Sequence, residues 1–351
     1  MYSATPFPDF NDESGSLERL LNPVIDEKRF RTAIRRQHTL FKIYANTSPV
    51  PLPASGQIVT TEIRNQCELY LPLADITAIF NKLYAAALNY QPILSSTPFH
   101  NSLSWADSFA ALPERFQFSP NPARLLACLL SDSDLMKQFL FASFLPERFY
   151  GGVERYPGQQ KFIKSWLGRR QKGPLSCMDA ACGTGEETYR LATILAETGI
   201  QPADLHIEGW TVEPLEVWAA ANLRLPNNKH REELLRTTTI ALLQHGYGNC
   251  VNFSCRDLLA SNRLTEGTIL FDLILCNGLL GGPIIHEKEQ LDLAVQNLVH
   301  VLAPGGILLA ADNFHGGWKQ QCPQSDLRAL LGKYGLKYVD TTDGIGGLKP
   351  D

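Results

Sequence analysis

The sequence predicts an α/β protein in which a doubly wound, mostly parallel sheet follows a mainly helical region. From about residue 173, short apolar runs alternate with helical patterns, which is typical of strands joined by helices that cover both faces of a sheet. The first of these runs leads through a Gly-X-Gly turn into a helix. Before residue 150, no segment alternates convincingly with period two. The 351 residues suffice for two domains, which we expect at 1–150 and 151–351.

The N-terminal domain is predicted to be helical because its apolar residues are spaced by threes, fours and sevens. The first such stretch contains Leu17, Leu20, Leu21, Phe30, Ile34, Phe41 and Tyr44. Further helices are expected over 71–90, 123–130 and 134–144, with proline-containing loops between them. This domain could form a lid over a substrate or bind a partner.

One N-terminal segment is strongly basic and contains no acid after Glu27. Its cations are Lys28, Arg29, Arg31, Arg35, Arg36 and Lys42. Such a face could dock an acidic protein or substrate, or it could be an ordinary solvated helix surface.

In the second domain, strands and helices are expected in alternation. Strands are predicted over 175–181, 205–212, 251–255, 271–276, 307–311 and 336–341. Helices are predicted over 187–197, 215–223, 289–302 and 325–334. The connections between successive parallel strands should be right-handed crossovers.

Composition limits the compartment and the partners. A net charge of −4 gives no reason to expect nucleic acid or an anionic membrane as partner. The eight cysteines form no Cys-X-X-Cys pair, and Cys177, Cys182 and Cys276 lie in or beside apolar strands, which favours a reduced cytoplasm. The N-terminus does not resemble a signal peptide, no apolar run is long enough to span a bilayer, and no metal site is predicted.

The loop after the first strand carries the most specific signal. Gly183 and Gly185 lack a Cβ, so a nucleoside ligand could lie directly on their backbone, as it does in strand–loop–helix crevices. A dinucleotide site would place a small residue at position 188 and leave the helix start free for a pyrophosphate. Here Thr188 stands at that position, and Glu186 and Glu187 begin the helix. Two carboxylates repel pyrophosphate but suit an ammonium and a sulfonium, so we expect S-adenosylmethionine.

Several side chains around the loop are candidate cofactor ligands. Asp179 ends the first strand and could organise the loop, of which Ala181 is part, and approach the methionine ammonium; alternatively it only caps the loop. Glu186 and Glu187 could contact the cofactor or merely complement the helix dipole. Glu213 follows the second strand and could accept hydrogen bonds from both ribose hydroxyls, or act as a helix cap.

The later strands add further candidates. Asp257 could accept from the adenine amino group with Leu258 against the ring, or pair with Arg256. Asn277 follows the fourth strand and should face the methyl donor. His286, shortly beyond, is the one plausible titrating base near that loop, although a loop histidine is more often solvated than catalytic.

Residues from about 173 to 341 resemble a class I S-adenosylmethionine-dependent methyltransferase with a Rossmann-like fold. Within that superfamily, residues 180–192 are similar to the glycine loop of the chemotaxis-receptor glutamate methyltransferases (CheR-type), whose Gly-Glu-Glu-X-Tyr-X-Leu-Ala signature is complete here. The later segments Phe271–Asn277 and Leu302–Leu308 match as well.

The chain also departs from that family. No arginine stands between Cys276 and Asn277, and Arg148-Phe149-Tyr150 only weakly matches the Phe-Phe-Arg element. The usual ribose acid falls on Thr211.

The resemblance implies transfer of a methyl group to an O or N nucleophile of an unidentified acceptor, a small molecule or a protein. Because an arginine fork is the natural holder of a carboxylate, its loss favours an acceptor other than a protein glutamate. Two alternatives stay open: a protein-glutamate O-methyltransferase, and a non-catalytic binding module with this fold.

Overall fold

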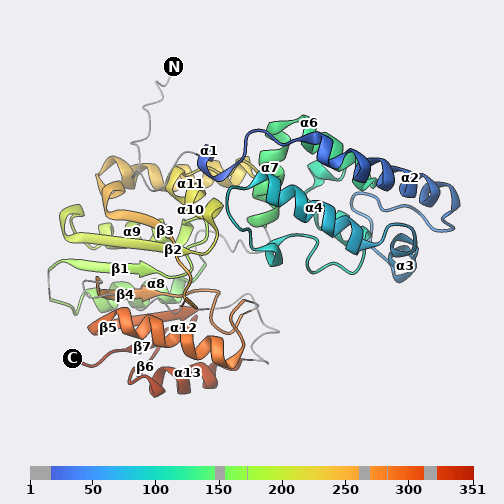
Figure 1. Cartoon of the computed structure of the whole chain (residues 1–351). Helices are drawn as coiled ribbons and strands as arrows, with labels where there is room; N and C mark the ends of the chain where they lie inside the picture. Colours follow the sequence, from blue (N-terminus) through green and yellow to red (C-terminus); the bar gives the residue numbers. More distant parts are fainter. Residues whose placement is uncertain (1–16, 147–154, 172, 261–268, 283, 312–321) are drawn as a thin grey trace. The chain divides into compact units, whose positions relative to one another are not determined.

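The computed structural model describes residues 17–146, 155–171, 173–260, 269–282, 284–311 and 322–351. The chain forms two compact units (Figure 1). One lies within Gly15–Tyr150 and includes Leu225–Lys229, and the other lies within Gly151–Arg224 and His230–Asp351. Arg148-Phe149-Tyr150, singled out in the sequence, lies outside the described residues.

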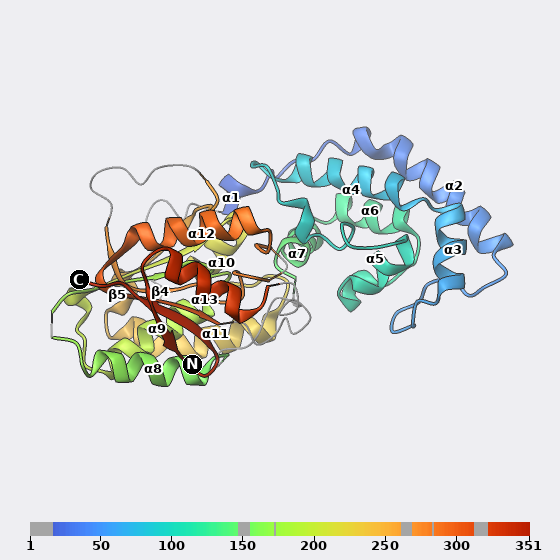
Figure 2. The same ribbon diagram turned by 90° about the horizontal axis from the view of Figure 1, so that it is seen from below.

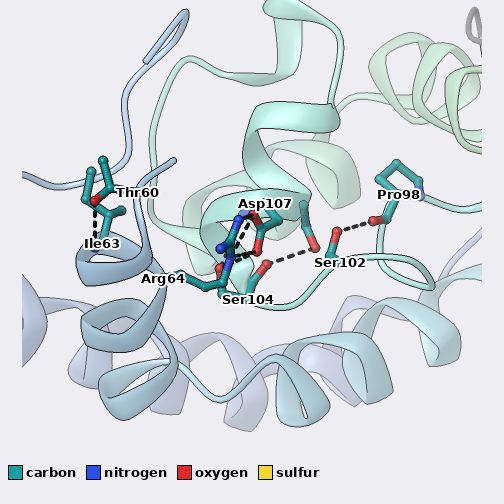
Figure 3. Close-up of polar contacts among 8 residues, drawn as sticks. Thr60, Ile63, Arg64, Pro98, Ser102, Ser104 and Asp107 are labelled. Atoms are coloured by element: carbon teal, nitrogen blue, oxygen red, sulfur yellow. Dashed lines mark hydrogen bonds and ion pairs between the residues drawn. The ribbon is translucent and has the colours of Figure 1, made fainter. Parts of the chain in front are cut away.

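The first unit is mainly helical, as predicted, and its described residues also contain loops and one isolated bridge between Leu21 and Leu88. Its helices are α1 (Leu17–Leu20), α2 (Arg31–Thr47), α3 (Thr61–Tyr70), α4 (Leu73–Ala87), α5 (Trp105–Ala111), α6 (Pro122–Ser131) and α7 (Ser133–Phe144). Side-chain caps set several of the boundaries: Thr60 accepts from the Ile63 amide at the start of α3, and Ser104 accepts from the Asp107 amide at the start of α5. Figure 3 shows the polar contacts around both caps.

Aromatic rings and one ion pair hold this unit together. Phe80 stacks on Phe99 with ring centroids 4.5 Å apart, and Tyr84 stacks on Phe139 at 6.0 Å. Arg64 on α3 donates from Nε and Nη2 to the carboxylate of Asp107 on α5, at 2.9 and 2.8 Å (Figure 3). Burial alone would raise the pKa of Asp107, but the hydrogen bonds from Arg64 and Ser104 hold it below its usual value.

The second unit is built on one seven-stranded sheet. Its strands are β1 (Leu175–Asp179), β2 (Leu205–Thr211), β3 (Val251–Cys255), β4 (Phe271–Leu275), β5 (Leu302–Ala311), β6 (Lys337–Asp340) and β7 (Gly344–Leu348). They are ordered β3-β2-β1-β4-β5-β7-β6 (Figure 1). The first five pair in parallel, and β7 runs antiparallel to both β5 and β6. The expected doubly wound, mostly parallel sheet is therefore confirmed.

Helices cover both faces of this sheet. They are α8 (Pro157–Leu167), α9 (Glu186–Glu197), α10 (Pro214–Asn222), α11 (Lys229–Gln244), α12 (Lys288–Val301) and α13 (Gln324–Lys333). Along β1, Met178 packs into a core with α12 and α13, whereas Leu175 and Cys177 pack into a second core with α8, α9 and α11. Figure 2 shows α12 and α8 on opposite sides of the strands. Because neighbouring side chains of a strand point to opposite faces, both faces of β1 are apolar.

The structure also contains elements that the sequence did not predict. Strand β7 reads Gly-Ile-Gly-Gly-Leu, a composition depleted in strands, so it was not recognised. A Cβ on Gly344 would lie 2.2 Å from the carbonyl oxygen of Ala310, so the glycine permits β7 to approach β5. The structure also adds helices α3, α5, α8 and α11. None of the described helices is both long and apolar enough to cross a bilayer.

Candidate cofactor site

The loop between β1 and α9 is organised by Asp179, which is fully buried. Its Oδ2 accepts from the hydroxyl of Thr188 at 2.7 Å, and its Oδ1 accepts from the amide of Ala181 at 3.4 Å. The loop is also tied to the neighbouring strands, because the Cys182 amide donates to the Trp210 carbonyl at 3.0 Å. Thr188, which departs from a dinucleotide pattern, therefore ties the first turn of α9 to the end of β1.

The two glycines of the loop have different surroundings although both adopt positive φ, +52° at Gly183 and +88° at Gly185. A Cβ on Gly185 would lie 2.9 Å from Ala220 Cβ and 3.1 Å from Phe253 Cζ, so this glycine is required by packing. A Cβ on Gly183 would have Glu216 Oε1, at 4.0 Å, as its nearest described atom outside the adjoining residues. The backbone of Gly183 is therefore open on the side where a Cβ would project.

Glu186 is held in a buried ion pair. Arg231 on α11 donates from Nε to Glu186 Oε1 at 2.7 Å, and both side chains are less than a tenth exposed. Glu186 Oε2 accepts from the Thr184 hydroxyl at 2.6 Å, and Arg231 also contacts that hydroxyl. Both oxygens of Glu186 thus have partners within the protein.

Glu187 points to a different set of residues at the end of β4. Asn277 Nδ2 lies 3.3 Å from both oxygens of the Glu187 carboxylate. The same amide makes two reciprocal hydrogen bonds with Gln159 on α8, at 2.8 and 3.0 Å, and its Oδ1 accepts from the Ala311 amide at 2.9 Å. All four hydrogen-bonding positions of Asn277 are occupied by protein groups.

The end of β2 places two carboxylates beside the loop. Glu213 is the N-cap of α10, and its Oε1 accepts from the Leu215 amide at 3.1 Å. Glu216, in the first turn of the helix, accepts from the Thr211 hydroxyl at 2.5 Å and presents Oε1 toward Gly183. Thr211 therefore holds, through its hydroxyl, a carboxylate that comes from α10.

The remaining candidates lie in different surroundings. Asp257 is exposed, and its Oδ1 accepts from the Leu259 amide at 2.8 Å. Arg256, the alternative partner of Asp257, follows β3, and its backbone amide donates to the Thr211 carbonyl. Leu258 is buried in the core that contains Ala180 and α12. His286 Nε2 lies 3.3 Å from Glu287 Oε1, just before α12.

Three carboxyls of this site have raised pKa values, and burial is the main cause for each. Burial raises the pKa of Asp179 to about 6, and the Thr188 hydrogen bond opposes this increase. The pKa of Glu187 is raised to about 8 by burial and by the charge of Asp179, against the charge of Arg155 and the Asn277 hydrogen bond. The pKa of Glu216 is raised to about 7, opposed by the Thr211 hydrogen bond. A cation placed among them would favour their charged forms.

Sequence reasoning missed Gln159, Glu216 and Arg231. Glu216 follows Glu213 by three residues, and this spacing within a first helical turn could have signalled it. Gln159 and Arg231 lie on α8 and α11, far along the chain from the glycine loop, and the sequence contains no signal that joins them to it. Among the described residues, no group of three or more histidines, cysteines or acids is arranged to hold a metal ion.

The sheet and its flanking helices form a Rossmann-like architecture. Neither a protein-family model nor a curated protein matches this chain. Among solved structures, N-methyltransferase NodS from Bradyrhizobium japonicum WM9, in complex with S-adenosyl-L-homocysteine, is similar with 16% identity and a TM-score of 0.39, over 63% of this chain and 100% of that chain. An O-methyltransferase family protein from Burkholderia thailandensis is similar with 15% identity and a TM-score of 0.40, over 93% of this chain and 96% of that chain.

A third similar structure is the sugar N-methyltransferase KedS8 from Streptoalloteichus sp ATCC 53650. It has 14% identity and a TM-score of 0.37, over 57% of this chain and 90% of that chain. At such values the likeness decides neither ligand nor chemistry, and both have to come from the geometry of the site.

Proposed function

We propose that the α/β unit binds S-adenosylmethionine and transfers its methyl group to an O or N nucleophile of an acceptor. The observation that carries this proposal is the open backbone of Gly183, flanked by buried carboxyls whose pKa values are raised. A ligand with an ammonium, a sulfonium and two ribose hydroxyls would supply positive charge that favours the ionised carboxyls, together with further hydrogen-bond donors.

The residues around the methionine end of such a ligand divide into three groups. Glu187 and Asp179, at the ends of α9 and β1, would face the ammonium, while the backbone from Ala181 through Gly183 to Gly185 would line the ligand. Glu186, whose oxygens are engaged by Arg231 and Thr184, would act by holding the start of α9.

The ribose and adenine would lie toward β2 and β3. Each of the two acids has one oxygen engaged, Glu213 Oε1 by the Leu215 amide and Glu216 Oε2 by the Thr211 hydroxyl. Because Glu216 Oε1 faces the open side of Gly183, Glu216 would be the main acceptor for the ribose hydroxyls, with Glu213 beside it. Asp257 and Leu258 would lie toward the adenine, with Asp257 accepting from its amino group.

When bound, this cofactor supplies a methyl group on an activated leaving group, so the chain needs chiefly to orient the acceptor. Asn277 is saturated by protein partners, so its side chain would position neighbouring groups instead of binding the acceptor. His286 remains the proposed base for an acceptor that must lose a proton.

Glycine substitutions give the sharpest test of the cofactor proposal. Gly183→Ala should fold but lose affinity for S-adenosylhomocysteine in calorimetry, because the new methyl would occupy the ligand's approach. Gly199→Ala is the matched control: its φ of +86° imposes similar backbone strain, and no described atom lies within 4 Å of the added Cβ. Normal binding by Gly183→Ala, or binding of NAD with no response to S-adenosylhomocysteine, would refute the proposal.

We propose an acceptor that is smaller than, or different from, a protein carboxylate, because no arginine stands between Cys276 and Asn277. The protein-glutamate alternative can be distinguished by incubating cell extract with methyl-labelled cofactor. Methyl esters on protein release methanol in mild alkali, whereas ethers and N-methyl products keep their label. Abundant alkali-labile protein label would reverse the assignment.

A further inference from the structure

Gln159 lies on α8, and both hydrogen bonds described for its buried side-chain amide lead to Asn277 of the candidate site. It is 2% exposed, although glutamine is usually found at protein surfaces. Its Nε2 donates to Asn277 Oδ1 at 3.0 Å, and its Oε1 accepts from Asn277 Nδ2 at 2.8 Å. Such a reciprocal pair fixes the position and the plane of the partner amide, and the Ala311 amide, which donates to Asn277 Oδ1 at 2.9 Å, fixes the direction in which it points.

The direction of the Asn277 amide matters because its two ends are chemically opposite. With Oδ1 turned to Gln159 and to the Ala311 amide, Nδ2 is the end that faces the Glu187 carboxylate at 3.3 Å. A flipped amide would present its carbonyl oxygen to that carboxylate, and two acceptors would repel each other.

The first turn of α8 is itself anchored. Asp343, in the connection between β6 and β7, accepts through Oδ2 from the backbone amides of Gly158 and Gln159, at 2.5 and 3.1 Å. A continuous set of hydrogen bonds therefore runs from Asp343 through Gln159 and Asn277 to Glu187.

We propose that Gln159 is a positioning residue, which fixes the Asn277 amide so that Nδ2 donates to the Glu187 carboxylate. This inference builds on the proposed function only in assigning Glu187 to the cofactor ammonium. The other charged groups that act on Glu187 are Asp179 from β1, Arg155 ahead of α8, and Glu186 on its own helix.

The test uses Gln159→Met, which keeps the length of the side chain and removes its hydrogen bonds. Gln160→Met is the matched control, since Gln160 is the next residue of α8 and its Oε1 accepts from Arg190 instead. The Glu187 carboxyl is titrated by NMR in the ligand-free full chain, with its signal assigned by Glu187→Gln.

We expect the pKa of Glu187 to rise by roughly half to one unit in Gln159→Met and to stay unchanged in Gln160→Met. Asp343→Ala, which releases the first turn of α8, should produce a smaller rise. A structural role alone would lower the Tm of Gln159→Met without moving the Glu187 titration, and that result would overturn the proposal.

Binding of S-adenosylhomocysteine by the same variants separates the two ideas. If the wild-type chain binds it, the pH midpoint of affinity should move upward in Gln159→Met together with the Glu187 titration. If the wild-type chain does not bind it, the proposed function fails, while the ligand-free titration still decides whether Gln159 positions Glu187.

Discussion

At the scale of single residues, neighbouring acids in one helical turn have separate tasks. Glu213 and Glu216 both follow β2, but one caps α10 through Oε1 and the other presents Oε1 toward Gly183. The sequence pointed to Glu213 as the acceptor for the ribose hydroxyls, and this role stays a prediction. The sequence could not decide between Glu213 and Glu216 as the ribose acceptor, because the two acids differ in their contacts. The Leu215 amide donates to Glu213, whereas Glu216 has an oxygen that faces Gly183.

Substituting these two acids one at a time should separate cap from ligand. Glu216→Gln should weaken S-adenosylhomocysteine binding by at least about tenfold, since hydrogen bonds to charged groups contribute about 1.5–3 kcal/mol each. Glu213→Ala should cost about 1 kcal/mol of stability through loss of the cap. Denaturant unfolding and calorimetry on both variants measure the two effects. Unchanged affinity in Glu216→Gln with a loss in Glu213→Ala would return the ribose to Glu213.

At the scale of elements, the strands and the helices next to them could be predicted from sequence, whereas the elements that complete the site could not. Strands β1 to β5 contain apolar runs, so alternation with helices marks them. Strand β7 could not be predicted from its composition, because it is rich in glycine. Its glycines are needed where the strand lies close to its neighbours, and these neighbours are known only from the structure. Helix α11 contacts the start of α9 through Arg231 and Glu186, which lie far apart along the chain.

The pair between α11 and α9 should be worth more than a surface pair of the same chemistry. Arg231→Met leaves the buried Glu186 carboxylate without its cation, and such a loss costs roughly 3–5 kcal/mol. Adding Glu186→Gln should recover part of that stability. The reference is Lys164→Met, which breaks the exposed pair between α8 and Glu197 and should cost less than about 1 kcal/mol. Equal losses in both single variants, measured by urea unfolding, would contradict the assignment.

At the scale of the whole molecule, the raised carboxyl pKa values give stability and ligand affinity opposite pH dependences. As pH rises, the stability of the ligand-free chain should fall and its affinity for the ligand should increase. Asp179, Glu187 and Glu216 hold protons more tightly in the folded chain than in the unfolded one. Their contribution to stability is therefore complete below their unfolded pKa values, near 4, and is lost as pH rises through about 6 to 8.

The ligand-free protein should accordingly melt at a higher temperature near pH 5.5 than near pH 8.5. Binding of S-adenosylhomocysteine, which carries an ammonium, should strengthen over the same range and release protons, because the cation favours the charged carboxylates. Thermal melts with and without ligand, and calorimetry in buffers of different ionisation enthalpy, measure both trends. Proton uptake on binding would have the wrong sign and would remove these carboxyls from the ligand site.

The position of the β6–β7 hairpin should be coupled to ligand binding. Among the described strands, β6 pairs only with β7, and their connection holds the first turn of α8 through Asp343. A ligand that requires Gln159 in place would thus also favour the docked hairpin. Linkage is reciprocal, so the hairpin raises the ligand's affinity by the same factor by which the ligand tightens the hairpin. Strands β6 and β7, at one edge of the sheet, would then influence the affinity of a site at the ends of β1 and β4.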